Sequence, residues 1–197
     1  MKNFHILLLI GSLLGSCGSK ESVSGDDLFE KGNYQAAINS YTEYLAGHPD
    51  HTKSIYNRGR AFEELGDVKK AKSDFEQVIE LDAKHVNAYL SLAKLAYNDH
   101  NYNKVLVYAG EAIELNSESA QAYFLSARGA HQLGFFDQAM ESYSNAIRIN
   151  KDFGEAYLYR GALKVGMEKS RSACEDFKLA KLLGVKEAEK ATQTYCK

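Results

Sequence analysis

Residues of the same kind recur every 34 positions along most of this chain. One set of such positions carries small residues, namely Gly25, Gly59, Ala93, Ala127 and Gly161. Two further sets carry apolar residues: Ala37, Ala71, Val105, Ala139 and Ala173, and also Tyr41, Phe75, Ala109, Tyr143 and Phe177. A fixed period of this length is typical of proteins built from stacked copies of one small unit. Because a single unit cannot bury its own apolar face, the units must stack against one another.

Each period contains the pattern of two amphipathic helices. Apolar residues such as Ala71, Phe75 and Val78 follow helical spacing and give each helix one apolar stripe. Glycines fall between the two helices, where they can adopt the left-handed backbone that ends a helix: Gly32, Gly66 and Gly134. We expect the small residues at Gly59 and its equivalents to let the paired helices approach closely. We expect bulky residues to fill the remaining space, namely Tyr89, Tyr123 and Tyr157.

A 34-residue period with this pattern resembles the tetratricopeptide repeat. The resemblance implies an all-α fold, a right-handed superhelical solenoid of about five helical hairpins with a C-terminal capping helix. The hairpins are expected at about 22–48, 52–82, 86–116, 120–150 and 154–183, and the capping helix at about 186–195. Two residues depart from the pattern, because His100 and Glu168 stand where the glycine between paired helices is expected.

The amino-terminal segment reads as a targeting signal. Lys2 precedes a short apolar run over residues 4–14, which is too short to span a bilayer as a helix. Residues 14–17, Leu-Gly-Ser-Cys, resemble a bacterial lipobox. This resemblance implies a lipoprotein signal peptide over 1–16, acylation of Cys17 with palmitate-type chains, a tether over 17–24 and the solenoid over 25–197. An ordinary secretory signal, with Cys17 incidental, is the alternative.

The start of the first hairpin leaves two possibilities open. Glu21 and Ser24 occupy positions where the repeat calls for apolar residues. This segment is therefore either the first helix of the first hairpin or part of the tether.

The two other cysteines lie at similar distances from a predicted turn near Gly184. Antiparallel helices on either side of that turn would bring Cys174 and Cys196 to the same level, and an exported protein meets an oxidising compartment. We expect a disulfide between them that contributes about 3 kcal/mol to stability. Two free thiols are the alternative.

Motifs of enzymes are missing from the sequence. It has no Gly-rich phosphate loop, no nucleophile elbow and no His-Glu-x-x-His zinc motif, so we expect neither an enzyme nor a cofactor. The tightest group of possible metal ligands, His48, Asp50 and His51, lacks a further ligand nearby and predicts solvated loop residues rather than a metal site. A net charge of −2 without a basic block disfavours nucleic acid as a partner.

The resemblance also implies a binding groove. In tetratricopeptide proteins the first helix of each hairpin lines a concave surface where peptides bind, and Arg60, Lys94 and Arg128 occupy equivalent positions on it. The other groove residues expected are Lys53, Tyr56, Asn87, Tyr97, Gln121, Phe124 and His131. Cations among aromatic rings suit an acidic peptide or a polypeptide C-terminus. The alternative is that these residues make only hydrogen bonds between helices.

These observations predict a lipid-anchored scaffold in the bacterial cell envelope. We expect it in the outer membrane, facing the periplasm or the cell surface, with a protein or peptide partner in its groove. The anchor would raise the effective concentration of that partner at the membrane. The alternative is a structural subunit of an envelope machine for outer-membrane assembly, secretion or cell-wall synthesis, which uses its convex face or ends. Its oligomeric state is open.

Overall fold

The computed structural model describes residues 20–196, so the predicted signal peptide, Cys17 and residue 197 lie outside the described residues. The described chain forms eleven helices, of which the first ten pair into five hairpins. The pairs are α1 (Lys20–Glu30) with α2 (Tyr34–Gly47), α3 (Thr52–Glu64) with α4 (Val68–Leu81), α5 (Val86–Asn98) with α6 (Tyr102–Leu115), α7 (Ala120–Gln132) with α8 (Phe136–Ile149), and α9 (Gly154–Gly166) with α10 (Ser170–Leu182). The last helix, α11 (Glu187–Tyr195), follows them.

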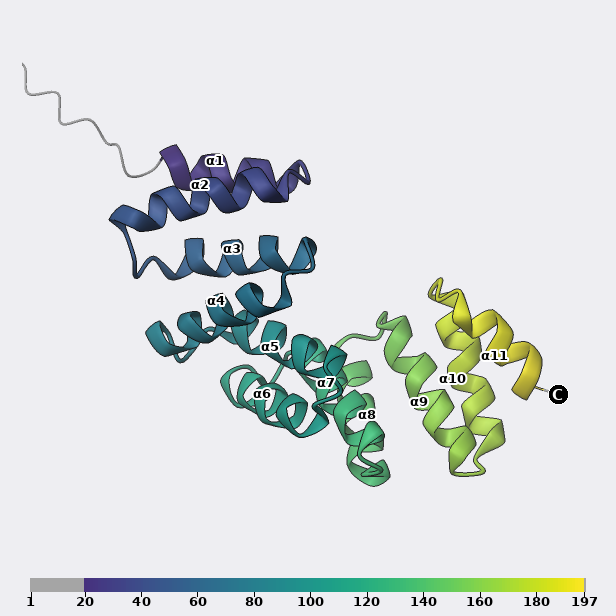
Figure 1. Ribbon diagram of the computed structural model, residues 1–197. Coiled ribbons are helices and arrows are strands. Elements are labelled where there is room, and N and C mark those ends of the chain that lie inside the picture. The colour runs from purple at the N-terminus through teal and green to yellow at the C-terminus, as the bar shows by residue number, and fades with distance from the viewer. Residues whose placement is uncertain (1–19, 197) are drawn as a thin grey trace, which may run out of the picture.

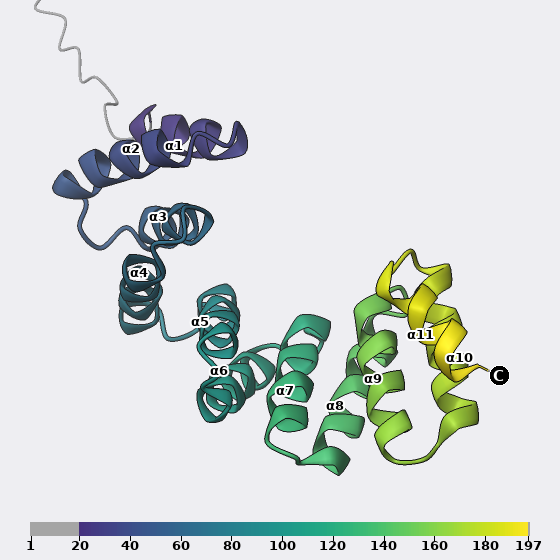
Figure 2. The same cartoon turned by 45° about the vertical axis from the view of Figure 1, so that its right-hand side comes forward.

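The hairpins stack in chain order into a curved solenoid. Figure 1 shows them following one another from purple α1 to yellow α11, and Figure 2 shows that the row bends into an arc. Helices α3 and α5 lie on the inner side of this arc, while α4 and α6 lie on its outer side. The predicted all-α solenoid with a C-terminal helix is confirmed.

The turn inside each hairpin requires a left-handed residue. Gly32, Gly66 and Gly134 have φ values of 75°, 77° and 79°, and His100 and Glu168 adopt the same region at 56° and 60°. In every hairpin the residue after this position donates its backbone N–H to the last turn of the first helix, as Asn101 does to the Ala96 carbonyl at 2.9 Å. This hydrogen bond is the reason why the conformation persists without glycine.

Glycine on the first helix makes room for an aromatic ring on the second. A Cβ added to Gly25, Gly59 or Gly161 would lie 2.5, 2.8 or 2.7 Å from the ring of Tyr41, Phe75 or Phe177, respectively. These rings are almost fully buried. The prediction that Tyr157 fills this space in the fifth hairpin is therefore wrong. Tyr89 and Tyr123 accompany Ala93 and Ala127, and their predicted role stays a prediction. In the first, second and fifth hairpins the space beside the glycine is filled by the aromatic ring of the partner helix.

The same substitution should have opposite effects at two helical glycines. Gly161→Ala pushes a methyl group into the buried Phe177 ring, so we expect the free energy of unfolding to fall by about 1–3 kcal/mol. Gly110→Ala in α6 meets no atom within 4 Å and should raise it by about 0.5–1 kcal/mol, because alanine favours helix. Urea unfolding followed by circular dichroism measures both changes. A gain at both sites would contradict the close contact between Gly161 and Phe177.

The first helix is complete, which settles one of the open alternatives. Leu28 and Phe29 pack against Ala37 and Tyr41 of the second helix, and Gly25 is buried. The tether predicted over 17–24 is corrected at residues 20–24, which belong to α1. The start of α1 has few apolar residues, and the helix is held by the apolar contacts of its later turns.

The carboxyl-terminal helix closes the last hairpin. Cys174 of α10 and Cys196, which caps α11, form the expected disulfide with their Cα atoms 5.2 Å apart. Ala188 is fully buried, and Lys181 pairs with Glu189 at 2.7 Å. None of the helices within residues 20–196 is long and apolar enough to cross a membrane.

Candidate functional site

A hollow of about 240 Å³ lies between the first helices of three successive hairpins, α3, α5 and α7. Half of the predicted groove residues line it: Tyr56, Arg60, Asn87, Lys94 and Gln121. Five residues that were not predicted for the groove also line the hollow: Glu63, Glu64, Leu90, Ser91 and Leu125. It is thus a polar surface of mixed charge with a small apolar part.

Two of the predicted groove cations are neutralised within the chain. Lys94 pairs with Glu63 at 2.8 Å, and the Glu63 side chain is only 19% exposed. Lys53 pairs with Asp26 at 2.7 Å. Asp26 stands at the position equivalent to Arg60 in the first hairpin, so the row of equivalent positions begins with an acid. The 34-residue period contains that information, although the sequence analysis did not use it.

Asp26 links the first two hairpins. It accepts hydrogen bonds from the Tyr41 hydroxyl at 2.7 Å and from the Asn57 amide at 2.8 Å, in addition to the Lys53 ammonium. Burial acts to raise the pKa of Asp26, but these three donors outweigh it and hold the pKa below its usual value. Burial and the neighbouring carboxylate raise the pKa of the Tyr41 hydroxyl. The Asp26 carboxylate therefore holds α1 against both α2 and α3.

The other two cations of the row rest on aromatic faces. The Arg60 guanidinium lies 4.5 Å from the centre of the Phe29 ring. The Arg128 guanidinium lies 3.8 Å from the centre of the Tyr97 ring and 5.0 Å from that of Tyr159. No ion pair to either arginine occurs among residues 20–196, and the buried Arg128 Nε has no hydrogen-bond partner in that part of the chain. Stacking restricts an arginine and leaves its edge free to donate hydrogen bonds.

The last two predicted groove residues make contacts within the α7–α8 region, Phe124 as a buried core residue and His131 as a partly buried one. Phe124 is 6% exposed and packs against Phe153, with ring centres 4.7 Å apart. His131 lies edge-on to Phe136 and Tyr143, and burial lowers its pKa. Phe124 therefore packs in the core between hairpins, and the partly buried His131 makes its ring contacts with α8.

Two buried ion pairs at equivalent positions escaped the sequence analysis. Arg58 donates from Nε and Nη2 to both carboxylate oxygens of Asp74, at 2.9 and 2.8 Å. Arg160 makes the same two bonds to Asp176, at the same distances, three repeats later. The two arginines, like the two aspartates, are separated by three whole 34-residue periods, and this is the signal that could have revealed the ion pairs.

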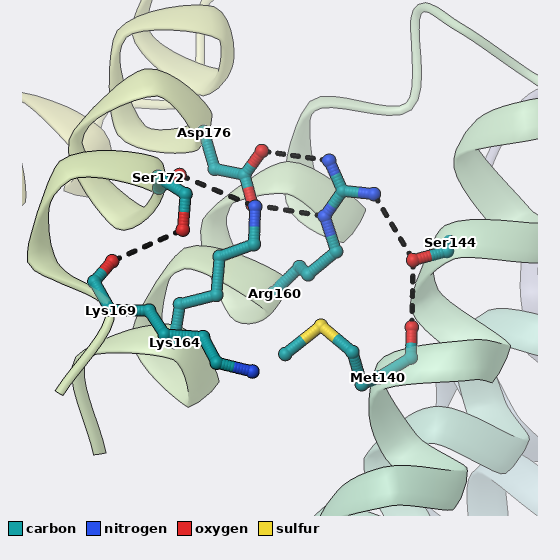
Figure 3. Close-up of polar contacts among 7 residues, drawn as sticks. All are labelled: Met140, Ser144, Arg160, Lys164, Lys169, Ser172 and Asp176. Carbon is teal, nitrogen blue, oxygen red and sulfur yellow. Dashed lines mark hydrogen bonds and ion pairs between the residues drawn. The ribbon is translucent and has the colours of Figure 1, made fainter. Parts of the chain in front are cut away.

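The Arg160–Asp176 pair is part of a larger network of polar contacts. Figure 3 shows Asp176 between Arg160 and Lys164, whose Nζ lies 2.7 Å from the carboxylate. Arg160 also donates from Nη1 to the Ser144 hydroxyl at 3.2 Å, and that hydroxyl donates to the Met140 carbonyl at 2.8 Å. The network therefore joins α8, α9 and α10, and its residues hold the hairpins together.

The histidines that the sequence analysis considered as metal ligands have structural contacts. His48 stacks on Tyr44 with ring centres 4.3 Å apart. His51 precedes α3, and its Nδ1 accepts the Ser54 backbone N–H at 3.3 Å. His85 makes the equivalent bond to Ala88 before α5, at 3.1 Å. Histidine thus caps two of the first helices.

Comparison with protein families gives matches over most of the repeat region. Models of the tetratricopeptide repeat match residues 23–83, 56–103 and 120–153. Tetratricopeptide repeat protein 12 of Mus musculus is 34% identical over 80 residues, which are 41% of this chain and 11% of that protein. FK506-binding protein-like of Mus musculus is 39% identical over 64 residues, 32% of this chain and 18% of that protein. The chain thus spans less than a fifth of each of these relatives.

Solved structures match over a larger share of the chain. The crystal structure of MamA has a TM-score of 0.74 and 25% identity, and the match covers 84% of this chain and 96% of MamA. YrrB, described as a TPR protein with an unusual peptide-binding site, has a TM-score of 0.72 at 18% identity, with 88% and 90% covered. PilF of Pseudomonas aeruginosa has a TM-score of 0.75 at 16% identity, with 90% and 88% covered. The last two similarities concern the fold alone.

Proposed function

Because the chain belongs to the tetratricopeptide repeat family, we propose that it is a scaffold that holds a peptide segment of a protein partner in the hollow between α3, α5 and α7. Proteins with this repeat are generally interaction modules without enzymatic activity. The observation that carries the proposal is that three successive first helices contribute exposed polar side chains to one surface. An extended peptide laid across them could bond to each helix in turn.

The proposed ligand is an acidic segment or a polypeptide C-terminus, because Arg60 is the one cation of the hollow without an ion-pair partner among residues 20–196. Lys94 already pairs with the Glu63 carboxylate, so we expect it to contribute little to the binding of an acidic ligand. Arg60 and Arg128 are stacked on rings, and a carboxylate of the ligand could accept their charge-assisted hydrogen bonds. Arg60 is the more exposed of the two and lines the hollow itself. We therefore assign the main anionic contact to Arg60.

The groove can be tested by capturing partners from envelope extracts with the mature protein and its variants. Arg60→Ala removes a charged hydrogen-bond donor, so we expect the partner to bind about tenfold more weakly or worse. Lys94→Ala should have a smaller effect, because Glu63 neutralises that lysine. Arg171→Ala, an exposed arginine of α10 outside the hollow, is the matched control and should leave capture unchanged.

Equal capture by all three variants would rule out the cationic groove. It would favour the alternative function, a structural subunit of an envelope machine for outer-membrane assembly, secretion or cell-wall synthesis that binds through its convex face or ends. Circular dichroism of each variant separates lost binding from lost folding.

We also propose that Cys17 is acylated and anchors the scaffold in the bacterial envelope, in the outer membrane, facing the periplasm or the cell surface. The lipobox-like residues 14–17 support this proposal. Cells grown with labelled palmitate should incorporate label into the protein. Cys17→Ser should abolish labelling, while the Cys174→Ser, Cys196→Ser double variant should retain it. Label that persists in Cys17→Ser would contradict the anchor.

A further inference from the structure

A second cleft, of about 340 Å³, lies between the second and third hairpins and shares no residue with the groove. Its floor comes from Leu92, Leu95 and Ala96 of α5. Its walls come from the start of α4 on one side and from α6 on the other, with Val68 and Tyr108 as their apolar members. The α5 residues of the cleft lie on a different face of that helix from Asn87, Ser91 and Lys94, which line the groove.

The apolar lining of this cleft is specific to the third hairpin. Leu92 and Tyr108 occupy the positions at which the second hairpin has Arg58 and Asp74 and the fifth has Arg160 and Asp176. In those hairpins a buried ion pair fills the space between the paired helices. The third hairpin has two apolar side chains there, of which Leu92 is buried at the bottom of the cleft and Tyr108 is partly exposed in its wall. A volume of this size suits one or two apolar side chains of a ligand.

Lysines stand on both walls of the cleft. Lys69 and Lys72 come from α4, and Lys104 comes from α6. Neither Lys69 nor Lys104 has an ion-pair partner among residues 20–196, and both are exposed. Lys72 lies 3.5 Å from Glu76, and Asp67, near Lys69, pairs with Lys70. Asp99 is the one acid of the lining, so the rim is cationic overall.

We propose that this cleft binds a peptide segment of a protein partner in which an apolar side chain of leucine or phenylalanine size is flanked by acidic residues on both sides. The apolar floor would receive the side chain, and Lys69 and Lys104 would meet the acids on the two walls. Free lysines on both walls favour a peptide over a fatty acid, which carries its single carboxylate at one end. The site is independent of the groove and would give the scaffold a second point of contact.

The test uses the whole chain in mild detergent and short synthetic peptides with a trifluoromethyl tag, followed by fluorine NMR. The probe has a central phenylalanine between glutamates, and its two controls replace the phenylalanine with alanine or the glutamates with lysines. The parent should bind the probe with a dissociation constant of about 0.1–1 mM and bind both controls at least threefold more weakly. Stronger or equal binding of either control would overturn the proposal.

Variants of the chain locate the binding. The double variant Lys69→Glu, Lys104→Glu changes two exposed side chains and should weaken binding of the probe threefold or more. Lys84→Glu, Lys151→Glu makes the same change in net charge in two loops away from the cleft and should bind like the parent. Ala96→Met, which fills the cleft with a flexible side chain, should also weaken binding.

Three further results would overturn the proposal. They are equal binding by the Lys69→Glu, Lys104→Glu variant and its charge-matched control, no binding of the probe by the parent at millimolar concentration, and displacement of the probe by decanoate but not by excess unlabelled peptide. The last result would reassign the cleft to an acyl chain. Arg60→Ala should leave binding of the probe unchanged, so failure of the groove proposal and failure of this one are distinguishable.

Discussion

Replacing Asp176 with alanine is expected to lower the free energy of unfolding by about 3–5 kcal/mol. The Asp176 side chain is 3% exposed, and its two partners, Arg160 and Lys164, are 17% and 16% exposed. Without the carboxylate, two nearly buried cations would face each other with no counter-charge. The loss should appear in urea unfolding, and faster hydrogen exchange in α9 and α10 than in α3 and α4 should locate it, because repeat proteins can unfold in parts.

The second hairpin provides the matched comparison. Asp74→Ala leaves only one cation, Arg58, whose side chain is 19% exposed, so its cost should be smaller than that of Asp176→Ala. The double variant Arg58→Leu, Asp74→Tyr transplants the residues that the third hairpin has at these positions. It should restore most of the lost stability, because apolar residues can replace a buried ion pair at little cost. A loss below about 1 kcal/mol for Asp176→Ala would contradict the assigned network.

Loss of the Cys174–Cys196 disulfide is expected to cost about 3 kcal/mol, because the bond restricts the loop between the two cysteines in the unfolded chain. Helix α11 has only 9 residues, and an isolated helix of that length is marginal in water. Besides the disulfide, its contacts with α10 include the Lys181–Glu189 pair, which is exposed, and the Phe177–Tyr195 ring contact at 5.7 Å. Reduction should therefore free α11 first.

Urea unfolding with and without dithiothreitol measures this cost. Hydrogen exchange over α11 should rise on reduction, and that over α3 to α6 should stay the same. The Cys174→Ser, Cys196→Ser double variant controls for other effects of the reductant and should unfold alike in both conditions. Equal stability of the oxidised and reduced parent would show that packing alone holds α11.

Much of the architecture follows from the sequence, because the same local pattern of residues recurs in every repeat. The positions of the helices from α2 onward, the turns at Gly32, Gly66 and Gly134 and the disulfide could all be predicted, whereas the sequence left the first helix open. Each depends on short-range spacing that repeats with one period, and a local departure such as His100 is overruled by the hydrogen bond that closes every turn.

The candidate site could be predicted only in part, because its chemistry depends on pairing across helices. Five of the ten predicted groove residues line one hollow, yet Lys53 and Lys94 are neutralised by Asp26 and Glu63. Phe124 lies within the core, and His131 is partly buried against aromatic rings of α8. The repeat spacing predicts the face of the helix on which a residue lies. It does not predict which side chain of a neighbouring helix contacts that residue.

The sequence by itself thus determined the repeat, the order of the hairpins and the places where the chain turns, since these depend on local spacing and backbone conformation. Only the tertiary structure decided which charges remain available, which aromatic ring fills the space beside each glycine, and where the third hairpin opens a cleft. The physical reason is that ion pairing and close packing act over a few ångströms between side chains from different helices. Their outcome therefore depends on how the hairpins stack.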